Sequence, residues 1–314
     1  MIKTPVDILQ GYPIRKTKKQ KQLFRDAVLR YTEALGYAAA VEAGNFGSRN
    51  VVIGDPETAR YLVTAHYDTC ARLLIPNFIT PCNAFIFYMT QFVIWFILIL
   101  LGALWGAIGG LLLGEAWVSL FSALSVLGMV GLMILGPANK NNANDNTSGV
   151  VTLLEIARTL PEKQRNKVCF VLFDLEEAGL IGSSSYRKTH KEATDCQLVI
   201  NLDCVGEGNH ILMIPTKSLK KDRHQLTSLH TVCGYFGKKS LLLKDKGFAV
   251  YPSDQRCFPY GVGICALNKG KCGLYLSRIH TRKDTVLDQT NVNILRAALI
   301  SYISRDAVNK KGRN

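Results

Sequence analysis

Three short apolar runs stand out along the chain, at residues 61–65, 168–173 and 198–202. They are rich in β-branched and aromatic side chains and nearly unbroken by polar ones, which is typical of strands buried on both faces of a sheet. Apolar positions with helical spacing lie around them, in residues 21–35, 149–159 and 291–304. This alternation predicts an α/β fold, a mixed sheet with a mostly parallel core sandwiched by helices.

An almost uncharged segment, residues 73–139, interrupts this alternation. Residues 73–114 contain no Asp, Glu, Lys, Arg or His over 42 positions, and Glu115 is the one charged residue before Lys140. About 20 apolar residues suffice to cross a bilayer as a helix. The segment therefore predicts an inserted transmembrane hairpin with spans at about 84–113 and 116–138. The alternatives are a pair of buried core helices or an apolar dimer interface.

The two flanks of the insert, residues 1–72 and 140–314, together form 247 residues, a suitable length for one α/β domain. Gly102, Gly106, Gly109 and Gly110 in the insert would let its two helices approach closely. Residues 1–13 lack the apolar core of a secretory signal. Nine scattered cysteines without a C-x-x-C pair fit a reducing, cytosolic setting.

The net charge of +14 is compatible with a nucleic-acid partner or with the basic cytoplasmic side of a membrane protein. The basic run in residues 15–25 shows no aromatic interleaving for base stacking, so we expect a solvated or lipid-contacting face and no nucleic-acid partner. The turn of the hairpin carries no Lys or Arg, whereas both termini are basic. The positive-inside rule therefore places both termini and the flanking domain on the cytoplasmic side of the cell membrane.

Acidic and histidine side chains gather just beyond the predicted strands: His66 and Asp68, then Asp174, Glu176 and Glu177, then Asp203. Chemistry in such sheets is concentrated at the carboxyl ends of the strands. Taken singly, each residue has an ordinary structural explanation. Together the carboxylates would repel one another, and a divalent cation, zinc first, relieves that cost. His66 and Asp68 are two positions apart and face the same way on an extended chain, so Asp68 can orient His66 from behind.

Five ordered motifs resemble the co-catalytic dizinc aminopeptidase family, which includes bacterial leucyl aminopeptidases, aminopeptidase Y, glutamate carboxypeptidase and glutaminyl cyclases. The motifs are H-x-D at 66–68, D-N-x-S-G at 145–149, E-E at 176–177, N-L-D at 201–203 and H-T-x-x-D-T at 280–285. Ser253, Asp254, Phe258 and the 261–264 segment also resemble a family motif, although Gln255 stands where the family has His. The resemblance covers roughly residues 20–72 and 140–304.

The resemblance implies a zinc peptidase domain whose two zinc ions, with cobalt or manganese as substitutes, are held by His66, Asp145, Glu177, Asp203 and His280. Asp145 would bridge the ions, with His66 and Asp203 on one and Glu177 and His280 on the other. Glu176 would be the catalytic general base, and Asp68 would assist catalysis through His66.

The function expected is a membrane-anchored aminopeptidase that acts on peptides. A carboxypeptidase or a glutaminyl cyclase of the same fold remains open, as does a non-catalytic membrane scaffold that binds peptides. The insert begins just past Asp68 and ends just before Asp145. We therefore expect the mouth of the site to lie against the bilayer and to favour hydrophobic or membrane-delivered peptides, whereas a hairpin that is only a tether predicts ordinary cytosolic ones.

Overall fold

A large mixed sheet forms the centre of the protein in the computed structural model, which describes residues 2–73 and 77–309. Within these residues ten strands pair in the order β1-β2-β4-β3-β5-β9-β6-β8-β7, with β10 paired to β9. The inner strands β4, β3, β5 and β9 run parallel, and the strands at both edges pair antiparallel. The predicted α/β class with a mostly parallel core is confirmed.

The predicted central strands are β3 (Tyr61–His66), β4 (Val168–Phe173) and β5 (Leu198–Leu202). Every residue in them is buried, which explains their unbroken apolar sequence. The predicted helices are also present, as α2 (Lys18–Ala34), α5 (Gly149–Thr159) and α9 (Gln289–Asn309).

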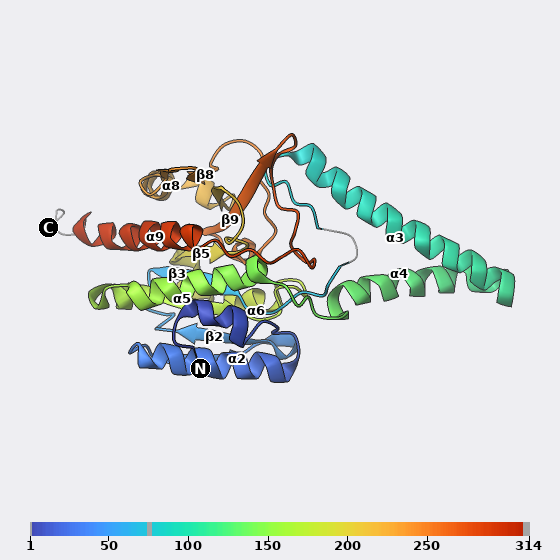
Figure 1. Ribbon diagram of the computed structural model, residues 1–314, viewed down its shortest axis with the longest axis horizontal. Helices are drawn as coiled ribbons and strands as arrows, with labels where there is room; N and C mark the ends of the chain where they lie inside the picture. Colours follow the sequence, from blue (N-terminus) through green and yellow to red (C-terminus); the bar gives the residue numbers. More distant parts are fainter. Residues whose placement is uncertain (1, 74–76, 310–314) are drawn as a thin grey trace.

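Alternate side chains of the central strands enter two apolar layers. Val63, Phe170 and Ile200 share one layer with side chains of α2, α5 and α9. Leu62, Val171 and Val199 share the other with Tyr186, which belongs to α6 (Ile181–Thr189). Helices therefore cover both faces of the sheet (Figure 1), and its strand ends are left free to carry polar side chains.

Further strands and helices complete the domain. The other strands are β1 (Ala39–Ala43), β2 (Arg49–Ile53), β6 (His210–Pro215), β7 (Gly234–Phe236), β8 (Lys239–Leu243), β9 (Gly261–Gly270) and β10 (Gly273–Tyr275). The other helices of the domain are α1 (Ile8–Gly11), α7 (Lys191–Cys196) and α8 (Arg223–His230). Short helical segments, η1 to η7, span Pro5–Asp7, Asn45–Gly47, Glu115–Trp117, Ala143–Ser148, Glu162–Lys167, Leu219–Lys221 and Asp254–Cys257.

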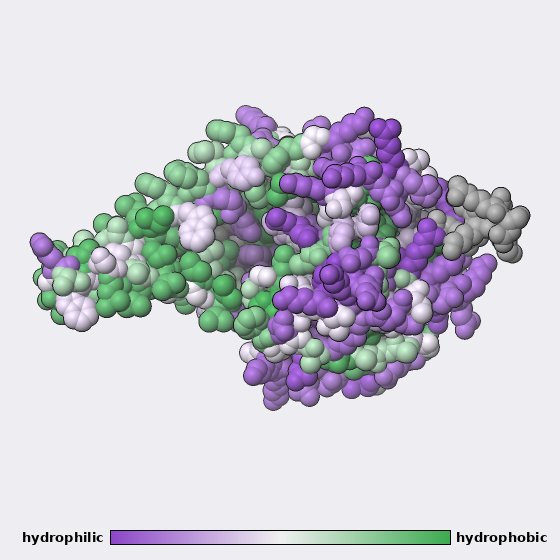
Figure 2. All heavy atoms as spheres, turned by 180° about the vertical axis from the view of Figure 1, so that it is seen from behind, coloured by the Kyte–Doolittle hydropathy of each residue, from purple (hydrophilic) through white to green (hydrophobic). Residues whose placement is uncertain are grey.

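The insert folds as two long helices, α3 (Ala84–Leu113) and α4 (Val118–Leu135), which project from one end of the domain (Figure 1). Both are long and apolar enough to cross a membrane. Figure 2 shows the hairpin as a nearly continuous apolar surface beside a mostly hydrophilic body. Every residue of α4 is at least partly exposed, so the alternative of two buried core helices is wrong.

Glycines of α3 allow the two helices to pack closely, as expected. A Cβ on Gly106 would lie 1.9 Å from Oγ of Ser122 and 2.8 Å from the carbonyl oxygen of Val118. A Cβ on Gly102 would lie 2.6 Å from the side chain of Val126. Any larger residue at these positions would force the helices apart.

The expectation of a solvated basic face in residues 15–25 is only partly correct. Arg15, Lys21 and Arg25 are buried, at 0, 7 and 8% exposure. Lys21 pairs with Asp174 at 2.6 Å, and Arg25 donates to the hydroxyl of Tyr67 at 2.9 Å. A charged side chain is buried only where such partners replace water, and these two partners directly follow β4 and β3, which are distant in sequence.

Candidate metal centre

The residues predicted as metal ligands lie together at the carboxyl ends of the central strands. His66 ends β3, Glu176 and Glu177 follow β4, and Asp203 follows β5. Asp145 lies in η4 before α5, and His280 follows β10. Ligand atoms of His66, Asp145 and Asp203 lie within 4.8 Å of one another, as do those of His66, Glu176 and Glu177.

Asp145 lies between the two histidines. Its Oδ1 is 3.2 Å from Nε2 of His66, and its Oδ2 is 2.9 Å from Nε2 of His280. Asp203 Oδ1 lies 3.6 Å from the same His66 nitrogen, and Glu177 Oε2 lies 3.3 Å from the same His280 nitrogen. Each oxygen of Asp145 therefore faces a different histidine–carboxylate pair, the arrangement that a carboxylate bridging two ions requires.

The donor set fits divalent metal. Oε1 of Glu177 and Oδ1 of Asp203 are buried and make no hydrogen bond within residues 2–73 and 77–309. Buried carboxylate oxygens without partners are costly. Imidazole nitrogens and carboxylate oxygens are zinc ligands, so zinc would satisfy these atoms and neutralise the clustered charge.

Asp68 contacts both the histidine and the glutamate pair. Its Oδ1 is 3.5 Å from Nδ1 of His66, on the side of the ring away from Asp145. Its two oxygens accept hydrogen bonds from the backbone nitrogens of Glu176 and Glu177 at 3.1 and 3.2 Å. Burial alone would raise the pKa of Asp68, but His66 and Lys21 outweigh burial and lower it. Asp68 therefore remains an acceptor that orients three residues of the site.

Burial raises the pKa of Glu176 well above its ordinary value; His66 opposes the rise, and Glu177 and Asp254 add to it. A carboxylate with a raised pKa is a stronger proton acceptor, as a general base requires. Asp254, from the Ser-Asp segment, is fully buried, and burial raises its pKa to about 7. Gln255, which replaces the family's His, donates to the carbonyl of Tyr251 at 2.7 Å and accepts from Asn201 at 3.1 Å, a structural role.

Asp174 does not join the cluster, although its position after β4 predicted it. Its Oδ1 pairs with Lys21 at 2.6 Å, and its Oδ2 accepts from the backbone nitrogen of Arg49 at 3.1 Å. The strand ends at Phe173, so Asp174 turns towards α2 while Glu176 and Glu177 turn towards the histidines. Partners far apart in sequence decide this difference.

Arg15 supports the site from the N-terminal segment, and sequence reasoning missed it. Its guanidinium donates to the carbonyls of Tyr67 and Tyr12 and to the hydroxyl of Thr147, so it links the segment of His66 to that of Asp145. Burial lowers its pKa to about 10, although Asp68 and Asp145 oppose this. No local pattern distinguishes Arg15 from its exposed neighbours Lys18 and Lys19.

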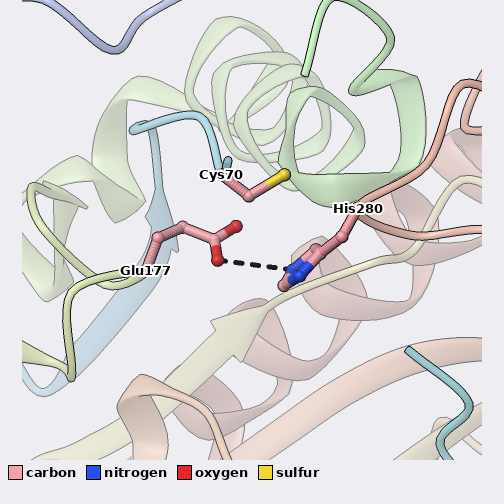
Figure 3. Close-up of side chains that lie close together, drawn as sticks. All are labelled: Cys70, Glu177 and His280. Carbon is pink, nitrogen blue, oxygen red and sulfur yellow. Dashed lines mark ion pairs between the residues drawn. The ribbon is translucent and has the colours of Figure 1, made fainter. Parts of the chain in front are cut away.

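Cys70 is a further residue that sequence reasoning missed. Its Sγ lies with Glu177 and His280 in a group of ligand atoms all within 4.8 Å of one another (Figure 3). The sequence carried a signal for it, because residues 66, 68 and 70 alternate along an extended segment and so face the same way.

The base of the hairpin contacts this centre. Ala71 and Ala138 form an antiparallel bridge, and the backbone nitrogen of Asn139 donates to the carbonyl of Cys70 at 3.0 Å. The nitrogen of Leu73 donates to the carbonyl of His280, also at 3.0 Å. The insert therefore emerges directly beside the candidate ligands.

A two-sided α/β sandwich with histidines and carboxylates at its strand ends is the architecture of zinc exopeptidases. The profile of peptidase family M28 matches residues 128–302, more than half of the chain, so the chain belongs to this family and the predicted family is confirmed. The match begins inside α4 and includes Asp145, Glu176, Glu177, Asp203 and His280, whereas His66 and Asp68 lie before it.

Two curated relatives match over short segments. Aminopeptidase YwaD of Bacillus subtilis is 43% identical over 67 residues, which are 20% of this chain and 15% of that protein. Probable leucine aminopeptidase 2 of Aspergillus oryzae is 37% identical over 75 residues, which are 23% of this chain and 15% of that protein. The chain thus matches only a small part of each relative's length.

Solved structures share the fold over nearly the whole chain. The glutaminyl cyclase of Porphyromonas gingivalis superposes with a TM-score of 0.57 at 18% identity, over 96% of this chain and 97% of that one. A Zn-dependent exopeptidase from Parabacteroides distasonis gives 0.57 at 16% identity, over 95% and 94%. The LapA aminopeptidase of Legionella pneumophila gives 0.58 at 15% identity, over 96% and 69%.

Proposed function

We propose that the chain is a membrane-anchored zinc aminopeptidase with two zinc ions. The observation that carries this proposal is the position of Asp145, whose two oxygens face His66 and His280 at 3.2 and 2.9 Å. His66 and Asp203 would hold one ion, Glu177 and His280 the other, and Asp145 would bridge them. Membership of the M28 family supports zinc and a peptide substrate.

Zinc held by these residues would supply Lewis acidity for the scissile carbonyl and for water. Glu176 acts as the general base: its carboxylate takes a proton from the attacking water and returns it to the leaving amine. The carboxylate of Asp68 lies 3.5 Å from Nδ1 of His66, which leaves Nε2 directed at the metal side, and it accepts hydrogen bonds from the backbone nitrogens of Glu176 and Glu177. Asp68 is therefore a positioning residue.

Membrane anchoring is supported by the exposed apolar hairpin of α3 and α4. The distribution of charge also supports anchoring. The ammonium of Lys16 donates to the carbonyl of Ile134 at 2.8 Å, which puts a basic side chain at the base of the hairpin. We infer that the domain and both termini lie on the cytoplasmic side of the bilayer.

The position of the hairpin suggests the substrate class. Its base is bonded to the segments of Cys70 and His280, so anchoring holds the site near the membrane surface. Peptides that partition into that surface are concentrated there, because burial of apolar side chains in lipid is favourable. We infer that hydrophobic or membrane-delivered peptides are preferred.

The test is to purify the chain in detergent, count zinc per chain, and assay aminoacyl-4-nitroanilides with and without a chelator. Two zinc ions with chelator-sensitive release of nitroaniline support the proposal. Zinc without release would reject the aminopeptidase and direct attention to carboxypeptidase or glutaminyl cyclase substrates. A chain without zinc would contradict the proposed centre and favour a non-catalytic scaffold.

A further inference from the structure

Cys70 is the thiol that lies among the candidate ligands. Its Sγ and the nearest ligand atoms of Glu177 and His280 are all within 4.8 Å of one another, and the three side chains point towards a common space (Figure 3). Cys70 is 2% exposed, so its side chain is directed into the site and away from solvent. The group around His66, Asp145 and Asp203 contains no sulfur among the described residues.

The backbone holds Cys70 in this position from both sides. Its carbonyl accepts from the nitrogen of Asn139 at 3.0 Å, and the next residue, Ala71, bridges to Ala138. The preceding residue, Thr69, accepts through Oγ1 from the backbone nitrogen of Arg15 at 2.9 Å. These bonds restrict the backbone, so the thiol lies beside Glu177 and His280 without any rearrangement of the chain.

We propose that Cys70 supplies a thiolate ligand to the zinc ion that Glu177 and His280 hold. The inference rests on the proposed function and deepens it, because the two ions would then have unlike ligands: nitrogen and oxygen at one, nitrogen, oxygen and sulfur at the other. Coordination replaces the S–H bond with a Zn–S bond, and the thiol proton leaves to solvent. Thiolates select zinc over manganese, so Cys70 would determine which metal occupies this position.

Cys204 provides a matched control. Like Cys70, which lies two residues after Asp68, Cys204 lies close in sequence to an aspartate of the site, because it directly follows Asp203. Both cysteines are 2% exposed. The side chain of Cys204 instead packs in an apolar cluster with Leu212, Tyr251 and Cys265. Replacement of Cys204 by Ala thus removes a buried thiol near the site without removing a proposed ligand.

The test is zinc K-edge X-ray absorption spectroscopy of the full chain in detergent, loaded to two zinc ions per chain. Zinc–sulfur distances are about 2.3 Å and zinc–nitrogen distances about 2.0–2.1 Å, so the two shells are distinct. We expect one sulfur per two zinc ions in the unmodified chain and in Cys204→Ala, and none in Cys70→Ser. We also expect Cys70→Ser to bind its weaker zinc ion at least about 10–100-fold less tightly, because this is the loss caused even by mutating residues that only hydrogen-bond to a metal ligand. The variant should also lose the preference for zinc over manganese.

A spectrum of the unmodified chain with only nitrogen and oxygen shells, at two zinc ions per chain, would overturn the role of Cys70 and leave the proposed function intact. Failure to bind zinc at all would overturn both. Because the spectrum of the unmodified chain decides the matter, the test does not depend on how well the Cys70→Ser variant folds.

Discussion

Asp284 anchors the segment of Asp145. Its Oδ2 accepts a hydrogen bond of 3.0 Å from the backbone nitrogen of Asp145, and its Oδ1 accepts one of 2.6 Å from the nitrogen of Asn144. Asp284 is fully buried, and burial together with the charge of Asp145 raises its pKa to about 8. The H-T-x-x-D-T motif thus contributes a proposed ligand, His280, and a support for the proposed bridging ligand.

We predict that Asp284→Asn weakens zinc binding by roughly 10–100-fold, because one of the two backbone donors would face an amide N–H. The buried donor left without a partner should also lower the free energy of unfolding by about 1–3 kcal/mol. Competition with a chromophoric chelator measures the first effect. Asp288→Asn is the control, since Asp288 is partly exposed and pairs with Lys239 outside the site. Equal losses in both variants would contradict this role.

Glu176 and Glu177 should separate in their effects although they are adjacent. Glu176→Gln should keep its zinc and lose roughly 10²–10⁴-fold in kcat, because an amide cannot accept the proton. Glu177→Ala should lose zinc, which elemental analysis of the purified protein detects. Near-normal turnover in Glu176→Gln would refute the general-base assignment.

Zinc binding should release protons at neutral pH. Burial alone would lower the pKa values of His66 and His280, but nearby carboxylates outweigh burial and raise both well above 6.5. In the zinc-free chain these protonated histidines stabilise the fold below pH 6.5, and that contribution is lost as the pH rises through their raised values. Zinc requires neutral imidazole, so its affinity should rise with pH over the same range.

Calorimetric titration of zinc at pH 7 in buffers of different ionisation enthalpy measures these protons. We expect at least one proton released per chain, and a zinc affinity that rises by up to about tenfold per pH unit for each proton released. Zinc binding that releases no protons and is unchanged by pH would show that the histidines are already neutral or are not ligands.

Arg15→Ala should destabilise the fold by about 2–5 kcal/mol, because it leaves a cavity and buried carbonyls without a donor. The matched variant Lys18→Ala lies three residues away on an exposed position and should change the unfolding free energy by less than about 0.5 kcal/mol. Denaturant unfolding in detergent compares the two. Equally small changes in the free energy of unfolding for both variants would mean that the buried contacts of Arg15 do not stabilise the fold.

The bridge between Ala71 and Ala138 makes the hairpin replaceable. A flexible Gly/Ser linker in place of residues 88–135 leaves Ile79 and Phe87 in their buried apolar cluster. The resulting chain should need no detergent and keep its zinc, since the ligands lie outside the insert. We expect its preference for hydrophobic over polar peptides, measured as a ratio of kcat/KM, to fall. An unchanged ratio would show that the hairpin is only a tether.

Much of the fold was predictable, for a local reason. The strands β3, β4 and β5 are buried on both faces, so each of their side chains must be apolar or hydrogen-bonded. The resulting apolar run can be recognised in the sequence without knowing which strands lie beside it. The edge strands β1, β7 and β10 are three to five residues long and half exposed, and no comparable pattern marks them. The hairpin was also visible in the sequence, because residues 73–114 form a long uncharged run, although most of its side chains are exposed in the structure.

The sequence by itself determined the fold class, the family and the order of the candidate ligands, because strand burial and motif spacing are properties of neighbouring residues. Only the tertiary structure decided that Asp174 pairs with Lys21, that Arg15 is buried, and that Cys70 joins Glu177 and His280. The contacts among Cys70, Glu177 and His280 join segments that are 103 to 210 residues apart. Burial and charge pairing between such segments depend on how the sheet brings its strand ends together, which no local pattern records.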